Sequence, residues 1–360
     1  MTLEDSGLRA AGLRLARIRG WVDWRTAASG WDQADEADTE AQGAACANAS
    51  TVGSFAGMAD SGESGAGFTA ETAAGLLAEA CADAGLSAVG ASMLRLGENA
   101  VFRLADPIVV RIGRSADRLD EAQRTVGVAR WLTEMDYPAV RLVPGVRQPA
   151  VVDGRVATFW QLVAAEERYA DVVQFAELMR RLHWLAEPPS LGLPYVDPLG
   201  PTLRRLGELG HLADDDRQFL RQRAESLGKR YDGLEFVLPF GMIHGDANVG
   251  NALLDESGRA VLIDLDGFEL GPREWDLTQT AMYYERYGWH TRTEYESFVR
   301  VYGFDVMNWY GYPVLADIRE LSMVVWLAQN ADHDERAATE LRRRISDLRT
   351  GGDRHGWSPF

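Results

Sequence analysis

Apolar positions follow no sustained period in the first part of the chain. Residues 27–67 are mostly small or acidic, with neither the alternation of a strand nor the 3.6-residue spacing of a helix. Such a segment buries too little apolar surface to offset its ordering entropy. We therefore expect residues 1–67 to form a mostly disordered extension. Within it, leucines among arginines at 7–24 favour a short helix, and Met58 offers a second start for translation.

From Phe68 onward, the pattern predicts a small antiparallel sheet with helices. A helical period begins after Thr69 and ends at Gly85, and a second one covers residues 117–134. Because successive short strands joined by tight turns pair antiparallel, residues 68–163 are expected to form an N-terminal α+β lobe. The predicted strands are 93–96, 100–104, 108–112 and 156–162.

Residues 164–350 are predicted to form a mostly helical C-terminal lobe. Its exception is 236–266, which reads as a strand, a loop and a hairpin that turns at 255–258. Residues 351–360 have no apolar period and are expected to be a tail. The fold class is therefore α+β with two lobes. The predicted helices are 173–184, 214–227, 276–286, 292–302, 313–330 and 334–349.

Composition excludes several classes of protein. The chain has 360 residues, enough for two lobes with a core. It lacks an apolar run of about 18 residues, so no membrane partner is expected. Its two cysteines, Cys46 and Cys81, form neither a disulfide framework nor a zinc pattern, which favours the reducing cytoplasm.

The net charge also bears on which classes of molecule the protein could bind. The formal net charge is −17, which disfavours a nucleic-acid surface because neutralising phosphates requires clustered Lys and Arg. The acidity is compatible with a cationic substrate drawn to an acidic cleft. It is equally compatible with acidity that only keeps the protein in solution.

One segment carries polar residues at spacings that suit phosphoryl transfer. His244-Gly245-Asp246 follows an apolar strand, Asn251 comes five positions later (251 − 246), and Asp264 comes eighteen later (264 − 246). The intervening hairpin brings two carboxylates and an amide oxygen to one end of a rigid element. Phosphoryl transfer needs a carboxylate for the acceptor hydroxyl and hard oxygen ligands for Mg²⁺. The alternative, that these aspartates only cap turns, does not account for the spacings.

Residues 240–277 resemble the aminoglycoside phosphotransferase family, the choline-kinase-like relatives of protein kinases. In that family the Asp of HGD-x-x-x-x-N is the catalytic base, and the Asn and a later Asp bind Mg²⁺. The resemblance places these roles on Asp246, Asn251 and Asp264. Protein kinases have HRD at this point, so Gly245 favours a small-molecule kinase. The resemblance implies a protein kinase-like fold with ATP and Mg²⁺ as cofactors.

The resemblance also suggests supporting residues around the catalytic loop. Asp266 matches a second acid near the metal, as an outer residue or a weaker ligand. Asp276 matches an acid that braces the loop. His244 is either a packed, hydrogen-bonded loop residue or a proton relay.

In the N-terminal lobe, the resemblance points to a nucleotide site. Arg111 stands where kinases place the phosphate-contacting lysine. A guanidinium binds phosphate bidentately, although Arg and Lys are not interchangeable. Its expected partner on the following helix is Glu121, or Thr125 one turn later. Adenine would meet main-chain groups from Gln161 to Val163, a segment that is otherwise a plain buried strand.

We therefore expect an ATP-dependent phosphotransferase that acts on a hydroxyl of a small molecule, such as an antibiotic, an amino sugar or an amino alcohol. The alternative is a catalytically degenerate module that binds a nucleotide or metabolite. The missing lysine favours that alternative, and the complete set of Asp246, Asn251 and Asp264 opposes it.

The acceptor site is expected among the C-terminal helices. Acidic residues there could meet an ammonium group, and aromatic residues could stack on a ring or a cation, unless they belong to the core. The acids are Glu274, Glu285, Asp317 and Glu320, and the aromatic residues are Tyr283, Tyr284, Trp289 and Trp326.

Overall fold

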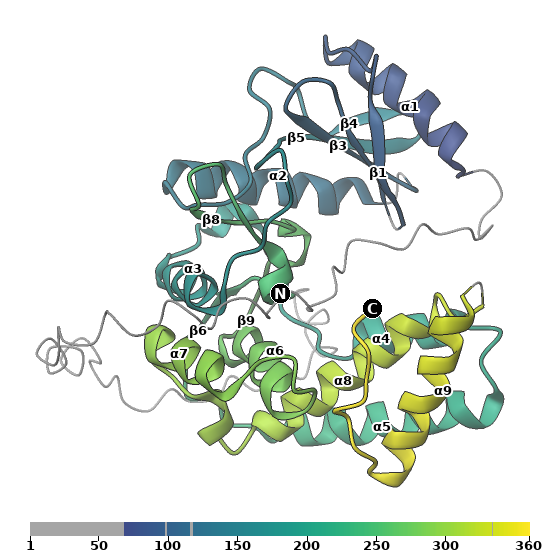
Figure 1. The fold of residues 1–360 in the computed structure, drawn as a ribbon, viewed down its shortest axis with the longest axis vertical. Coiled ribbons are helices and arrows are strands. Elements are labelled where there is room, and N and C mark those ends of the chain that lie inside the picture. Colours follow the sequence, from purple (N-terminus) through teal and green to yellow (C-terminus); the bar gives the residue numbers. More distant parts are fainter. Residues whose placement is uncertain (1–67, 98, 116–117, 333) are drawn as a thin grey trace, which may run out of the picture. The chain divides into compact units, whose positions relative to one another are not determined.

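The computed structural model describes residues 68–360, except residues 98, 116–117 and 333 (Figure 1). The expected extension over residues 1–67, with its segment 7–24 and Met58, lies outside the described residues. A lobe built on a sheet comes first in the described chain, and a helical lobe follows it.

The first lobe contains a five-stranded antiparallel sheet in the order β1-β2-β3-β5-β4. Four of these strands confirm the sequence prediction. The fifth, β4, was not predicted because three residues are too few to show a period. The strands are β1 (Ser92–Leu96), β2 (Asn99–Arg103), β3 (Ile108–Gly113), β4 (Ala150–Val152) and β5 (Arg155–Gln161).

Two helices accompany this sheet and belong to different cores. Helix α1 (Ala70–Asp83) begins with a capping box formed by Thr69 and Thr72, and its apolar face packs in the core of the sheet. Helix α2 (Leu119–Glu134) instead buries Trp131 in the larger core of the helical lobe. Helix α2 therefore links the two lobes, because it contacts both strand β5 and the turn at residues 265–267.

The helical lobe is built around α8, which packs against α4, α5, α6 and α9 (Figure 1). The helices at α3 and α5 to α9 confirm the prediction, whereas α4 is too short for a clear period. Among the described helices, none has the length and apolar character needed to cross a membrane. The helices are α3 (Val172–Trp184), α4 (Gly200–Glu208), α5 (Asp214–Tyr231), α6 (Glu274–Glu285), α7 (Arg292–Tyr302), α8 (Tyr312–Ala328) and α9 (Glu335–Thr350).

Two small sheets carry the loops of interest. Strand β6 (Phe240–Ile243) pairs with β9 (Glu269–Pro272), and β7 (Ala252–Leu254) pairs with β8 (Ala260–Leu262). The β7–β8 hairpin was predicted, but the β6–β9 pairing was not. Because Ala139 forms a parallel bridge with Leu262, the segment after α2 is attached directly to the hairpin.

The last ten residues are irregular, as expected, but they are docked on the helical lobe. The Trp357 side chain is only 2% exposed. Glu340 accepts a hydrogen bond from the Ser358 main chain at 3.0 Å, and Arg354 pairs with Glu320 at 3.2 Å. The segment therefore completes the core instead of forming the free tail that its composition suggested.

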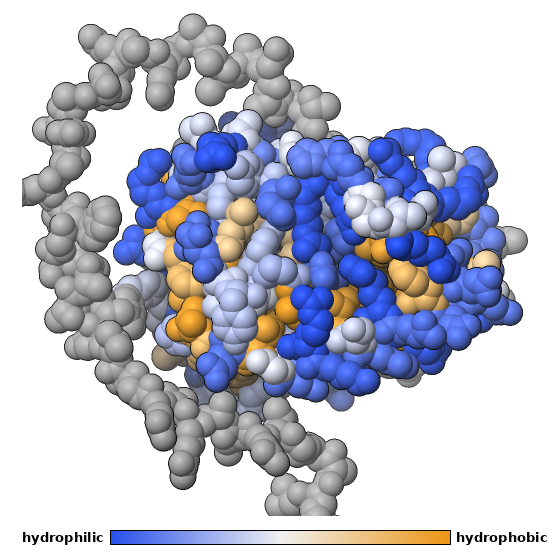
Figure 2. Space-filling model, turned by 90° about the horizontal axis from the view of Figure 1, so that it is seen from below, coloured by the Kyte–Doolittle hydropathy of each residue, from blue (hydrophilic) through white to orange (hydrophobic). Residues whose placement is uncertain are grey.

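Figure 2 shows one face of the molecule as mostly hydrophilic, with smaller, separate hydrophobic areas. Apolar atoms commonly contribute much of a folded protein's surface, so these scattered areas do not by themselves mark a binding site.

Candidate active site

The loop after β6 holds the first predicted site residue. The Asp246 side chain is 56% exposed. The Asn251 amide nitrogen donates to the Asp246 main-chain oxygen at 2.8 Å and to its carboxylate Oδ2 at 3.2 Å. The predicted pair is thus brought together. Both hydrogen bonds use the side-chain nitrogen of Asn251, which leaves its side-chain oxygen, Oδ1, as the atom suited to a hard cation.

Glycine at position 245 has a direct structural reason. Its φ is +85°, and a Cβ placed there would lie 2.1 Å from the carbonyl oxygen of Gly267. A Cβ on Gly267 would in turn lie 2.8 Å from the His244 carbonyl oxygen. Two backbone segments therefore approach so closely that both positions require glycine, and this approach holds the two loops together.

Asp264 lies beside Asn251 on the loop that follows β8. The Ile263 amide donates to the Asn251 carbonyl oxygen at 2.9 Å, and the Asp264 side chain is 46% exposed. Its backbone is left-handed, with φ 56° and ψ 62°. Such conformations are uncommon outside glycine and cluster at functional sites. The hairpin therefore brings together the three polar groups expected from the sequence.

Arg111 extends from β3 to the acids of the second loop. Its guanidinium lies 3.4 Å from Asp264 and 2.5 Å from Asp266. Burial would lower the pKa of Arg111, but the carboxylates of Asp266 and Asp264 raise it above its usual value. Arg111 therefore stays charged and connects the sheet lobe to the catalytic region.

The expected helical partner of Arg111 is not the one in the structure. Glu121 pairs with Arg118 at 3.9 Å, and the Thr125 hydroxyl donates to the Glu121 carbonyl oxygen at 3.1 Å. A guanidinium fork can engage two carboxylates at once. Asp264 and Asp266 satisfy Arg111 in this way, so the prediction of a pair with α2 is corrected.

Asp276 braces the catalytic loop from inside the protein. Its fully buried carboxylate accepts hydrogen bonds from the main-chain amides of His244 at 2.6 Å and Gly245 at 3.0 Å, and from His183 at 3.0 Å. Burial opposes ionisation, but the His183 hydrogen bond and the surrounding donors hold the pKa of Asp276 below its usual value. The contact agrees with the bracing role expected for this acid.

His244 is buried with both ring nitrogens engaged. Its Nε2 donates to the Ile263 carbonyl oxygen at 3.1 Å, and its Nδ1 accepts from the Asp246 amide at 3.3 Å. These partners require the neutral ring with the proton on Nε2. The geometry supports the packed-residue interpretation, because the ring offers no free nitrogen for a proton relay.

The predicted adenine segment is partly engaged by the chain itself. The Gln161 amide donates to the Arg141 carbonyl oxygen, and the Leu162 amide donates to the Pro107 carbonyl oxygen, both at 2.8 Å. The Gln161 side chain donates to the Leu142 carbonyl oxygen. Gln161 therefore holds the segment in place, while Val163 follows at the end of these contacts.

The four acids expected to meet an ammonium group have partners within the protein. Glu274 is fully buried and accepts from the Val237 and Leu238 amides. Glu285 accepts from the Tyr312 hydroxyl. The pairs of the other two acids are Asp317 with Arg223, Arg230 and Arg286, and Glu320 with Arg223, Arg286 and Arg354.

The aromatic residues proposed for stacking mostly belong to the core. Tyr283 is 2% exposed and packs near Trp289, with ring centroids 4.9 Å apart. Tyr284 stacks on Tyr295 at 5.2 Å. Trp326 is partly buried against the same core. The core interpretation is therefore favoured for Tyr283 and Tyr284.

The sequence analysis missed Arg319, which α8 brings to the catalytic loop. Its guanidinium donates to the Gly245 carbonyl oxygen at 2.6 Å and lies 3.7 Å from the Asp246 carboxylate. It also covers the Trp275 ring at 4.3 Å. Burial lowers the pKa of Arg319. A signal was present: an arginine within a largely apolar helix needs a partner when that helix is buried.

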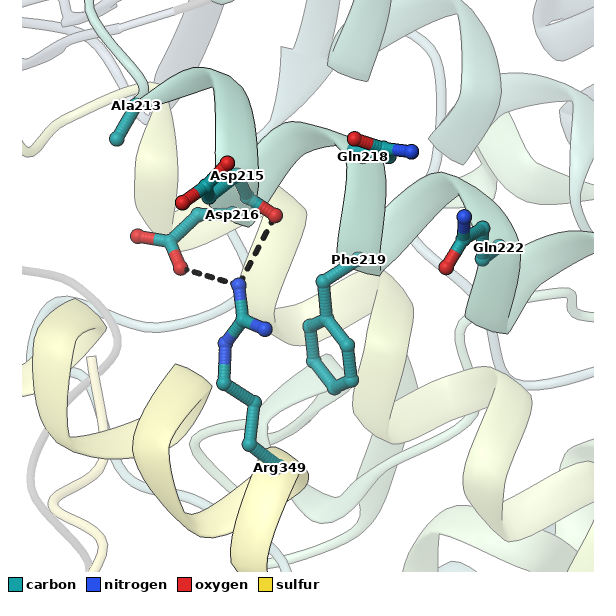
Figure 3. A pocket seen from close by; sticks show the side chains of 7 residues that line it. All are labelled: Ala213, Asp215, Asp216, Gln218, Phe219, Gln222 and Arg349. Carbon is teal, nitrogen blue, oxygen red and sulfur yellow. Dashed lines mark hydrogen bonds and ion pairs between the residues drawn. The ribbon is translucent and has the colours of Figure 1, made fainter.

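The cavity at α5 and α9 lies elsewhere (Figure 3). It measures ≈540 Å³, and its lining residues include Phe219 and Arg349 but none of the candidate site residues. Arg349 donates to the Asp215 carbonyl oxygen and the Asp216 carboxylate, and it covers the Phe219 ring at 4.3 Å. We interpret this region as a contact between helices, because Arg349 of α9 binds the first turn of α5 there.

Known proteins resemble this chain in sequence pattern and in fold. The model of the phosphotransferase enzyme family matches residues 95–318. Among curated proteins, no significant match was found. Solved structures with a similar fold include amicoumacin kinase hAmiN in complex with AMP-PNP, Ca²⁺ and Ami, at 15% identity and a TM-score of 0.58, covering 74% of this chain and 90% of the other.

Two further structures share this fold at low identity. Spectinomycin phosphotransferase, in complex with ADP and spectinomycin, has 12% identity and a TM-score of 0.54, covering 73% of this chain and 90% of its own. A choline kinase from Streptococcus pneumoniae has 14% identity and a TM-score of 0.50, and the match covers 72% of this chain and 94% of the kinase. These likenesses confirm the predicted two-lobed α+β fold of the protein kinase type.

Proposed function

Because the chain belongs to the phosphotransferase enzyme family, we propose that it transfers the γ-phosphate of ATP to a hydroxyl group of a small molecule, with Asp246 as the catalytic base. The observation that carries this proposal is the exposed Asp246 carboxylate held by Asn251 beside Asp264. A base of this kind orients the acceptor hydroxyl and takes its proton as phosphate is transferred.

The residues present fit a magnesium site that substrate phosphates would complete. Mg²⁺ is usually held by one or two carboxylates together with phosphates and water. In the described part of the chain no cluster of three or more His, Cys, Asp or Glu could hold a metal, so a cage made only of such side chains is not expected there. We propose Asp264 and the side-chain oxygen Oδ1 of Asn251 as ligands, with Asp266 nearby. A bound ion would neutralise charge on the phosphates.

Arg111 would bind the phosphates after exchanging its partners. In the structure it pairs with Asp264 and Asp266. Nucleotide binding would place phosphate oxygens against the guanidinium fork and free Asp264 for the metal. At the other end of the nucleotide, we propose that adenine meets the main chain at Val163, since the amides of Gln161 and Leu162 are engaged.

The acceptor is proposed to be a small hydroxylated compound, with an antibiotic, an amino sugar or an amino alcohol as the candidates. A cationic acceptor suits the net charge of −17. However, the acids expected to recognise an ammonium group have partners within the protein, and Glu274 and Glu320 are fully buried. Of the four, only Glu285 keeps a largely exposed side chain, at 44%, so an acceptor without a positive charge is equally compatible with the site.

The test is ATP consumption against a panel of hydroxylated amines and antibiotics, with Asp246→Asn as the control. For a productive acceptor, Asp246→Asn should lower single-turnover phosphate transfer by about 10²- to 10⁴-fold while Mg-ATP affinity is largely kept. Asp264→Ala should weaken Mg-ATP binding as well. Wild-type turnover in Asp246→Ala would refute the assignment of the base. ATP binding without turnover on any acceptor would favour the degenerate binding module.

A further inference from the structure

The peptide unit between Gly245 and Asp246 is held from both sides. Its carbonyl oxygen accepts from Arg319 at 2.6 Å and from the Trp275 indole at 2.9 Å. Its amide donates to His244 at 3.3 Å. Because the Asp246 side chain leaves the backbone next to this peptide, rotation of the peptide would swing the carboxylate away from its place.

Arg319 contributes contacts in three different directions. One nitrogen binds the carbonyl, another lies 3.7 Å from Asp246 Oδ1, and the face of the guanidinium lies over the Trp275 ring at 4.3 Å. A planar group held at its edge and its face has a defined orientation. The contact with Oδ1 is too long for a hydrogen bond, so this oxygen keeps its capacity to accept a bond from a substrate hydroxyl.

Burying the Arg319 guanidinium costs free energy, and an apolar side chain could pack in the same place without that cost. The Arg319 side chain is 11% exposed, and its Nε has no hydrogen-bond partner among the described residues. Burying a charge is unfavourable, and an apolar side chain of similar size usually fills such a space without that penalty. The contacts that the charge and the planar fork make at the loop help to offset this cost.

We propose that Arg319 is a positioning residue, through which α8 holds the Gly245–Asp246 peptide and aims the Asp246 carboxylate at the acceptor hydroxyl. This inference rests on the proposed function, in which Asp246 is the base. It also makes α8 the element that couples the packing of the helical lobe to the geometry of the catalytic loop.

The test compares Arg319→Gln and Arg319→Lys with a matched control, Arg286→Gln. Arg286 is similarly buried, at 15% exposure, and its guanidinium also joins the region of α6 to α8, through Asp317 and Glu320. No contact connects it to the catalytic loop in the described structure. The control therefore removes a buried guanidinium without changing the support of Asp246.

Two measurements are made on the full-length variants. Arg319→Gln should lower kcat by about 10- to 100-fold, because misplacing a catalytic group by about 1 Å has effects of this size, with KM for ATP changed less than about twofold. Hydrogen exchange of the peptide containing 243–251 should accelerate. Arg319→Lys should recover part of kcat. Arg286→Gln should leave both the loop exchange and the kcat close to wild type.

The outcomes separate this inference from the proposed function. Unchanged kcat and loop exchange in folded Arg319→Gln would overturn the positioning role, as would an equal loss in Arg286→Gln. If Arg319→Gln does not fold, the same comparison between Arg319→Lys and Arg286→Lys decides the question. Faster loop exchange in a protein that phosphorylates no acceptor would contradict the proposed function and would support only the claim that Arg319 holds the Gly245–Asp246 peptide.

Discussion

At the scale of single residues, Gly245 determines how closely the two functional loops approach. Its φ of +85° and the contact of 2.1 Å that a Cβ would make with the Gly267 carbonyl oxygen are separate constraints. Gly258 in the β7–β8 turn has a similar φ of +81°, but a Cβ at that position would meet nothing within 4 Å. Substituting the two glycines therefore separates the free-energy cost of the left-handed backbone from the cost of the close contact between the two loops.

We predict that Gly258→Ala costs about 1 kcal/mol of folding free energy, the usual penalty for a left-handed residue. Gly245→Ala should cost clearly more, because the two backbones must also move apart, and it should reduce turnover. Denaturant unfolding of both variants measures the difference. Equal costs would show that the close approach to Gly267 is not a constraint.

Glu269 on β9 is a second residue whose effect can be measured, because its raised pKa makes stability depend on pH. Burial raises the pKa of its carboxyl to about 7; Arg319 opposes this shift, and Asp197 adds to it. When the folded state raises the pKa of an acid, the protein is more stable with that acid neutral than with it ionised. That contribution is fully present below the unfolded value of 4.5 and is lost as the pH rises through about 7.

We therefore predict that Glu269→Gln changes stability in a pH-dependent way. At about pH 8, the variant should be more stable than wild type by about 1 to 2 kcal/mol. This is less than the free energy that corresponds to the whole pKa shift, because the side chain is only partly buried. At about pH 4, the two proteins should be nearly equal. Thermal unfolding at both pH values tests this, and a gain that does not depend on pH would contradict it.

At the scale of elements, residues 351–360 act as part of the helical lobe. Trp357 stacks on Tyr287 with ring centroids 5.6 Å apart, and its indole donates to Asp347 at 2.8 Å. In the same segment, the His355 side chain is 60% exposed. An irregular segment can thus be as firmly docked as a helix when it buries a large aromatic side chain.

Removing the Trp357 side chain should destabilise the protein strongly. We predict a loss of about 3 to 5 kcal/mol for Trp357→Ala, the range for truncating a buried aromatic residue, and less than about 0.5 kcal/mol for the exposed control His355→Ala. Deleting 351–360 should lower the melting temperature at least as much as Trp357→Ala. A deletion that leaves the melting temperature unchanged would show that the segment is only a tail.

At the scale of the whole molecule, Arg111 joins the sheet lobe to the catalytic region through Asp266 and Asp264. In the proposed function, Arg111 would bind the phosphates and Asp264 the metal, so the proposal predicts that Mg-ATP competes with this link. The pair of Arg118 and Glu121, at 3.9 Å with side chains 51% and 40% exposed, is a local contact within one helical turn and provides a control.

A double-mutant cycle of Arg111→Gln and Asp266→Asn should give a coupling of about 0.5 to 1 kcal/mol in thermal unfolding without ligand. Saturating Mg-ATP should reduce this coupling, since Arg111 then binds phosphate. The Arg118 and Glu121 cycle should give less than about 0.5 kcal/mol under both conditions. A coupling for Arg111 that is unaffected by Mg-ATP would contradict the exchange of partners.

Local signals explain which elements could be predicted from the sequence. Helix α7 was predicted over 292–302 and has those bounds, because Thr291 caps its start and Gly303 ends it. Strands β4 and β9 have three and four residues. They exist through pairing with partners elsewhere in the chain, so their own residues carry too weak a period to reveal them.

The sequence by itself determined the group Asp246, Asn251 and Asp264, because a loop and a hairpin of fixed length bring these residues together locally. Only the tertiary structure decided that Arg111 pairs with Asp266, 155 positions away, and that Arg319 supports Gly245, 74 positions away. Contacts of this range depend on how helices and sheets pack, and packing leaves no periodic trace in the residues on either side.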